Sequence, residues 1–122
     1  MALQTRSQKF AVAAHTRVAA RTDAERKTNK EYVTFAKKFP ALIHTCGLAQ
    51  SIAFALAKDH TAYIADLAAV LKAIGHSNLS TANDLNQLAC NELLGGYMRL
   101  SRDSLQAASW LKRYVEVLGE GE

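Results

Sequence analysis

The sequence lacks the short motifs by which most active sites are recognised. Its 122 residues contain no GxGxxG or GxxxxGK[ST] phosphate loop, no HExxH motif and no cysteine pair at zinc-ligand spacing. Charges interrupt the apolar run near the N-terminus, so we find no secretory signal. Only two cysteines occur, Cys46 and Cys90. We therefore predict a cytoplasmic protein with reduced thiols, no enzyme activity, no metal and no cofactor.

Three chemical alternatives stay open on the residues alone. His44 and Cys46 are two positions apart and could ligate a metal together with the distant Cys90. A cysteine and a histidine could also form a nucleophile pair, although no third group that would orient them is evident. Gly95 and Gly96 could cradle a phosphate, but they follow a helical pattern and not a strand.

Proline, glycine and aromatic residues are also scarce. The chain has one proline, six glycines and 7% aromatic residues, whereas 49% of its residues are hydrophobic. Alanine and leucine dominate that fraction, and turn signals do not recur at the intervals typical of strands. This composition predicts an all-α fold: a single-domain, compact bundle of about six helices over residues 1–122, with residues 119–122 as a frayed tail.

Charge is absent from residues 39–57, a run of about the length that crosses a bilayer. Pro40 and Gly47 interrupt this run, and polar side chains lie within it, so we predict buried core and not a membrane span. The expected structure is a helix that kinks or restarts at Pro40 and stops at Gly47, followed by a second helix. Because the second helix is apolar on nearly all sides, we expect Leu48 and Phe54 to be buried.

Apolar residues recur at helical spacing through the rest of the chain. Thr81 and Asp84 have the spacing of a capping box, and Ser101 is a second candidate N-cap, with Asp103 in the first turn after it. The adjacent Gly95–Gly96 pair is interpreted as a point where another helix approaches closely. The predicted helices occupy residues 3–21, 30–46, 48–58, 61–74, 82–100 and 102–118.

Acidic residues are few near the N-terminus. Residues 1–38 contain nine basic and three acidic side chains, whereas the rest of the chain has six basic and eight acidic ones. Clustered lysine and arginine release counterions from a phosphate backbone, so this asymmetry favours a polyanionic partner. The alternative is a charged surface that serves only solubility.

Two segments resemble a known family. Residues 30–58, KEYVTFAKKFPALIHTCGLAQSIAFALAK, resemble the core signature of the small subunit of the type III-B CRISPR effector, the Cmr complex. The shared pattern is Lys-x-Tyr, hydrophobic-Pro-x-Leu-Ile, Gly-Leu, and an alanine-phenylalanine helix ending in lysine. Residues 93–119, LLGGYMRLSRDSLQAASWLKRYVEVLG, resemble the closing segment of the same family. Within the first segment, Phe39 before the proline and Cys46 before the glycine depart from the family's commoner residues.

The resemblance implies a non-catalytic, all-α subunit of an RNA-guided antiviral ribonucleoprotein. Small subunits of this type form a minor filament and line the channel that holds the crRNA–target RNA duplex. The implied partners are the backbone and large subunits of the Cmr effector, neighbouring copies of the chain itself, crRNA and target RNA, with no membrane and no small-molecule substrate. Because the guide reads sequence by base pairing, such a subunit needs only phosphate contacts and shape.

Basic residues on predicted helix surfaces are our candidates for RNA binding. They are Arg17, Arg21, Lys30, Lys37, Lys38, Lys112 and Arg113. For each one the alternative is a solvated surface charge, and Tyr114 beside them could stack on bases. Two other functions stay open: the small subunit of the related type III-A complex, and a stand-alone helical DNA-binding regulator. The regulator would need a base-reading helix, but the helix after Gly47 offers only Gln50 and Ser51.

Overall fold

Six α-helices make up most of the computed structural model, which describes residues 5–20, 30–76, 79 and 81–119. These described segments contain no β-strand, so the predicted all-α fold of about six helices is confirmed. The helices are α1 (Arg6–Ala20), α3 (Lys30–Cys46), α4 (Leu48–Ala57), α5 (Thr61–Ala73), α6 (Ala82–Asn91) and α7 (Leu94–Tyr114), and a π-helical turn, η1 (Val115–Gly119), follows α7.

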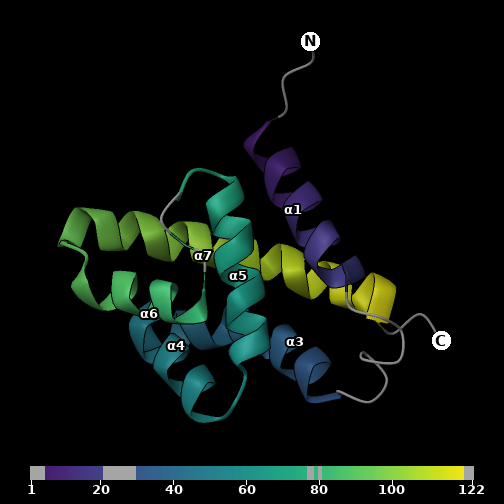
Figure 1. Ribbon diagram of the computed structural model, residues 1–122, viewed down its shortest axis with the longest axis horizontal. Coiled ribbons are helices and arrows are strands. Elements are labelled where there is room, and N and C mark those ends of the chain that lie inside the picture. The colour runs from purple at the N-terminus through teal and green to yellow at the C-terminus, as the bar shows by residue number, and fades with distance from the viewer. Residues whose placement is uncertain (1–4, 21–29, 77–78, 80, 120–122) are drawn as a thin grey trace.

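The longest helix, α7, supports most of the others (Figure 1). It packs against α1, α3 and α5, while α4 lies against α3, α5 and α6. The turn η1 contacts both α1 and α3. As a result, α1, α3 and the C-terminal end of α7 meet at the right-hand end of Figure 1, whereas α6 and the first half of α7 lie at the other end.

Apolar stripes on α1 and α3 face the core, as their spacing predicts. Three aromatic rings meet where α3 packs on α5: Phe35 and Phe39 lie 5.3 Å apart between ring centroids, and Tyr63 lies 5.5 and 5.1 Å from them. All three side chains are buried, and their tilted and edge-on arrangement is favourable for aromatic pairs. The apolar residues that recur at helical spacing on α1 and α3 are all buried: Phe10, Ala14, Val18, Tyr32, Phe35, Ala36 and Phe39; Leu3, expected in the same stripe, lies outside the described residues.

The uncharged run forms the second half of α3 and all of α4. Helix α3 continues through Pro40 to Cys46, so of the two expected outcomes, a kink or a restart at the proline, the restart does not occur, whereas the stop at Gly47, with φ of 84°, is confirmed. Leu48 is fully buried as expected, but Phe54 is 42% exposed because α4 lies at the edge of the bundle with one side open to solvent (Figure 1). Among the described helices, none is long and apolar enough to cross a membrane.

The capping box at the start of α6 is confirmed, but the next boundary differs from the expectation. The hydroxyl oxygen of Thr81 accepts a hydrogen bond from the backbone N–H of Asp84, and the Asp84 carboxylate accepts one from the N–H of Thr81, both over 3.1 Å. The backbone becomes extended at Glu92 and Leu93, and α7 then runs without a break through Ser101. The predicted cap at Ser101 is therefore wrong.

This shifted boundary changes two local interpretations. Gly95 and Gly96 lie in the first turn of α7 and not at a helix crossing, since a Cβ atom on Gly95 would meet nothing within 4 Å and the nearest atoms to one on Gly96 belong to the side chain of Glu92, just before α7. Asp103, expected in the first turn of a helix, lies in the middle of α7 and is buried. A buried carboxylate requires partners, and those of Asp103 come from other elements.

Candidate nucleic-acid interface

Arg17, a candidate RNA contact on α1, faces a buried carboxylate on α5. Its Nε and Nη2 atoms donate to Oδ1 of Asp66 over 3.0 and 2.8 Å, and the Tyr32 hydroxyl of α3 donates to Oδ2. The Asp66 side chain has no exposed surface, so these donors compensate a charge that burial would otherwise destabilise. The ion pair gives Arg17 a structural role. The Arg17 side chain is 42% exposed, and RNA contact through these exposed atoms stays a prediction.

Tyr63 borders this ion pair from within α5. Burial, together with the electrostatic influence of Tyr32 and Asp66, raises the pKa of the Tyr63 hydroxyl well above its ordinary value. The hydroxyl therefore stays protonated at neutral pH. Tyr63 acts as a packing group of the core and has no capacity to serve as a general base under these conditions.

The structure describes only some of the candidate RNA-binding residues between Arg21 and Lys38. Arg21 lies outside the described residues, and Lys30 begins α3 with a side chain that is also outside the description. Lys38 is exposed on the outer side of α3, whereas Lys37 beside it is half-buried. The predicted outward orientation therefore holds most clearly for Lys38.

Lys112 and Arg113 lie in the last turn of α7, beside a row of aromatic rings. The Cζ atom of Arg113 is 5.6 Å from the ring centroid of Trp110, and Trp110 stacks on Tyr114 with centroids 5.9 Å apart. Tyr114 in turn meets the ring of His15 on α1 in an edge-on contact of 5.2 Å. Arg113 and His15 are exposed and both larger rings are half-buried, so cationic and aromatic atoms share one accessible surface.

The helices that carry these candidates converge at one end of the bundle. Helices α1 and α3 both contact η1, which continues the last turn of α7, and all of them meet on the right of Figure 1. Arg17, Arg113 and the start of α3 thus belong to the same end of the molecule. None of these positions was predicted to be close to another from sequence spacing alone.

A second cationic group lies near the middle of α7 and was missed by the sequence analysis. Oδ1 of the buried Asp103 side chain lies 2.7 Å from Nη2 of Arg6 at the start of α1, and Oδ2 lies 2.9 Å from Nε2 of His76, which follows α5. Burial alone would raise the pKa of Asp103, but the hydrogen bonds with His76 and Arg6 and their charges hold it below its ordinary value. Asp103 therefore stays ionised and joins three elements.

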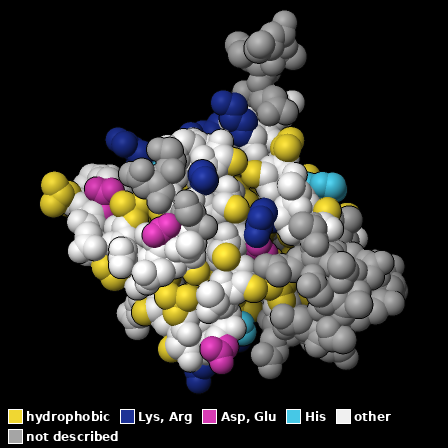
Figure 2. Space-filling view, viewed as in Figure 1, with side chains coloured by type: hydrophobic (Ala, Val, Ile, Leu, Met, Phe, Trp, Pro, Cys, Tyr) yellow, Lys and Arg dark blue, Asp and Glu magenta, His cyan; other side chains and the backbone are white. Residues whose placement is uncertain are grey.

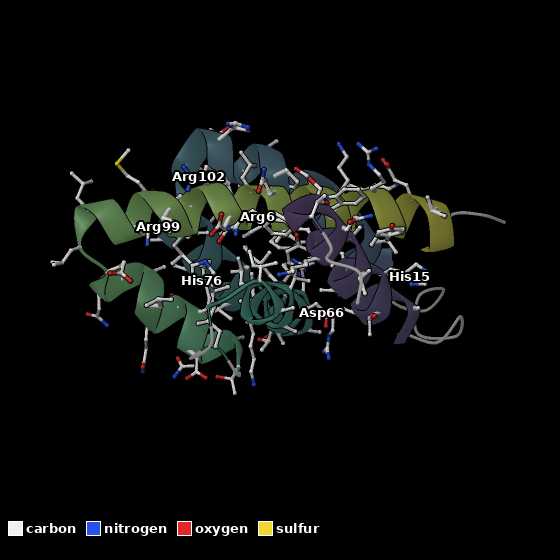
Figure 3. The ribbon with its side chains drawn as sticks, turned by 90° about the horizontal axis from the view of Figure 1, so that it is seen from above. Arg6, His15, Asp66, His76, Arg99 and Arg102 are labelled. Atoms are coloured by element: carbon white, nitrogen blue, oxygen red, sulfur yellow. The ribbon has the colours of Figure 1, made fainter. Side chains whose placement is uncertain are left out.

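Arg99 lies one helical turn before Asp103 on α7, and Arg102 lies three positions after Arg99, so the two arginines are neighbours on the helix surface. Both are exposed. Figure 3 views the whole molecule from above and shows Arg99 and Arg102 on α7, with Arg6 at the start of α1 and His76 nearby. In the sequence, the only signal for this cationic group is the pattern Arg-x-x-Arg-Asp at residues 99–103. The pattern indicates helical neighbours only if one helix runs through Ser101.

Metal chemistry has no support in the described part of the chain. Within residues 5–20, 30–76, 79 and 81–119, no group of three or more histidine, cysteine or acidic side chains could hold a metal ion. Cys46 and Cys90 are exposed free thiols.

Comparisons with known proteins agree on one family. The family model described as "CRISPR-associated protein (Cas_Cmr5)" matches residues 6–118. A curated relative, "CRISPR system Cmr subunit Cmr5" of Thermus thermophilus, is 36% identical over 121 residues, covering 97% of this chain and 99% of that protein. The crystal structure of a CRISPR-associated Cmr5 family protein from the same organism superimposes with a TM-score of 0.81 at 35% identity, covering 94% of this chain and 98% of the other.

Proposed function

The chain belongs to the Cas_Cmr5 family of CRISPR-associated proteins, and we propose that it is the small, non-catalytic subunit of a type III-B Cmr effector complex. The observation that carries this proposal is the family match, which spans residues 6–118 and so includes every described α-helix. Agreement in length and fold with a protein named as a Cmr subunit adds support. The same match favours this assignment over a type III-A subunit and over a stand-alone regulator.

Within the complex, this subunit takes its place in a minor filament beside the backbone subunits and lines the channel for the crRNA–target RNA duplex. Its partners are the backbone and large subunits, neighbouring copies of itself, and both RNA strands. The complex acts in the cytoplasm in antiviral defence. Sequence recognition belongs to guide–target pairing, so this chain contributes shape and phosphate contacts only.

RNA contact in this proposal uses the basic surface where α1, α3 and the end of α7 meet. Arg113 offers an exposed cationic group and Tyr114 a partly exposed ring there, and Lys38 is exposed eight positions after the start of α3. Such a surface is suited to a phosphate backbone because its charges lie on several helices and not on one base-reading helix. Arg17, Arg21, Lys30, Lys37 and Lys112 complete the proposed set.

A non-catalytic role is consistent with the condition of the buried titratable groups. Asp66 and Asp103 are both occupied by ion pairs, and Tyr63 is held protonated by burial. These groups stabilise the fold and have no free proton acceptor to offer a substrate. The proposal assigns the cleavage of RNA to other subunits.

Reconstitution tests this proposal. The remaining effector subunits and guide RNA are assembled with and without the chain, and the affinity for target RNA and the rate of its cleavage are measured. We expect the purified chain alone to cleave nothing, and its addition to strengthen target binding by the complex. A matched control adds the Leu48→Asp variant, whose buried position cannot hold a charge. RNA cleavage by the chain alone, or equal effects of the wild type and this control, would contradict the proposal.

A further inference from the structure

We infer that a second cationic surface, consisting of Arg6, Arg99 and Arg102, binds phosphate groups of the RNA in the assembled complex. The inference rests on the proposed function and adds a binding site at a different place on the chain. This Arg6–Arg99–Arg102 surface lies over the middle of α7 and the beginning of α1, away from the last turn of α7, which carries Arg113.

The charges on this surface exceed what the fold itself neutralises. Asp103 compensates one positive charge by pairing with Arg6 and His76. Neither Arg99 nor Arg102 forms an ion pair with any residue that the structure describes. Two exposed arginines three positions apart on one helix repel each other, so folding gives no reason for the pair. An external anion would remove this repulsion.

Arg6 is held in a fixed orientation while remaining accessible. Its guanidinium group contacts the Asp103 carboxylate at 2.7 Å and lies 5.5 Å from the ring centroid of Phe10, yet 53% of the side chain is exposed. A guanidinium has five N–H donors, and one carboxylate uses only part of them. The remaining donors are therefore positioned in advance for a second anion, which reduces the entropy lost on binding.

The shape of the cationic surface favours an extended polyanion. Lys9 lies one helical turn after Arg6, and Lys72 lies in the last turn of α5, and both are exposed. Figure 2 shows Lys and Arg side chains gathered along the upper part of this face, over the beginning of α1 and the end of α5. Cations distributed over three helices match a continuous row of phosphates better than one or two carboxylates of a partner protein.

The experiment uses the reconstituted effector complex with charge-reversed subunits. Arg102→Glu is compared with Lys58→Glu, which makes the same change in charge at the exposed end of α4, at the opposite, lower end of Figure 1. The double variant Arg99→Glu/Arg102→Glu strengthens the test. For each complex we measure recovery of the chain with its partner subunits, and the affinity for target RNA at several salt concentrations.

We expect normal assembly of all variants and roughly tenfold weaker RNA binding by the double variant. The slope of log affinity against log salt should decrease by about 1.4, because two phosphate contacts on a single strand are lost. Arg102→Glu should show part of this effect and Lys58→Glu none. Equal affinities and slopes for Arg102→Glu and Lys58→Glu would overturn the inference. Loss of the arginine variants from the complex would also overturn it, because the surface would then bind an acidic subunit. Failure of the wild-type chain to assemble would contradict the proposed function instead.

Discussion

Arg17 on α1 and Asp66 on α5 form an ion pair in which the carboxylate is completely buried, while 42% of the arginine side chain remains exposed. The pair joins residues 49 positions apart and fixes α1 against the centre of the bundle. The same arginine is a candidate RNA contact, so structural and binding roles must be separated by measurement.

Replacing Arg17 by alanine should lower the free energy of unfolding by about 2 kcal/mol, because the buried Asp66 carboxylate then loses the two hydrogen bonds that the Arg17 guanidinium donates. Chemical denaturation of the isolated chain measures this value. In the background of Asp66→Asn, Arg17→Ala should cost much less, since no buried charge remains to be compensated. Equal costs in both backgrounds would show that the ion pair has no energetic role.

Asp103 should make the stability of the chain depend on acid pH. Its pKa is held below the ordinary value of 3.8 in the folded state, so at pH values around and below 3.8 the unfolded chain binds more protons than the folded one. The stabilising contribution is therefore complete above this value and is lost as the pH falls through the lower folded-state pKa. Urea denaturation between pH 7 and pH 3 measures the effect. Asp103→Asn should show a smaller loss of stability over the acid part of this range, and an unchanged pH profile would contradict the assignment.

Leu48 and Phe54 lie on the same apolar helix, but substitution should affect them differently. Leu48→Ala should destabilise the fold by about 3 kcal/mol, because the side chain is fully buried and leaves a cavity. Phe54→Ala should cost about 1 kcal/mol, since 42% of that residue is already exposed. Thermal and urea denaturation of both variants test the comparison. Equal destabilisation would mean that the exposed side of α4 is covered in solution.

Lys38→Glu should weaken target-RNA binding by the assembled complex severalfold and reduce the salt slope by about 0.7, the value for one lost phosphate contact on a single strand. The free energy of unfolding should change by less than about 0.5 kcal/mol, because the side chain is exposed. Titrations of labelled RNA at several salt concentrations provide the measurement, and Lys58→Glu is the matched control. If Lys38→Glu and Lys58→Glu gave the same affinity, Lys38 would be a solvated surface charge.

Local signals predicted the fold well where the physical cause lies within a few residues. Gly47 ends α3 because a left-handed backbone conformation is needed there, and the reciprocal bonds of Thr81 and Asp84 start α6. The break at Leu93 has no such signal. Leu93 has no side-chain cap and is 81% exposed, although the helix expected over residues 82–100 would have run through it. The serine at position 101 looked like a cap but lies within α7.

Non-local partners account for what the sequence could not predict about the candidate site. Asp66 and Asp103 are buried only because Arg17 and Arg6, each distant in sequence, reach them from α1. The spacing of residues on one helix carries no information about such pairs. Family resemblance, in contrast, depends on the order of residues along the chain, so it indicated the correct family before any contact was known.

The central claim, that this chain is the small subunit of a Cmr effector, is tested most directly by purification of the tagged chain from its host cells at moderate salt. The bound proteins are identified and the bound RNA is sequenced, with an untagged strain as the control. We expect several partner subunits together with short RNAs that share one repeated end. Recovery of the chain alone, or with duplex DNA, would contradict the claim.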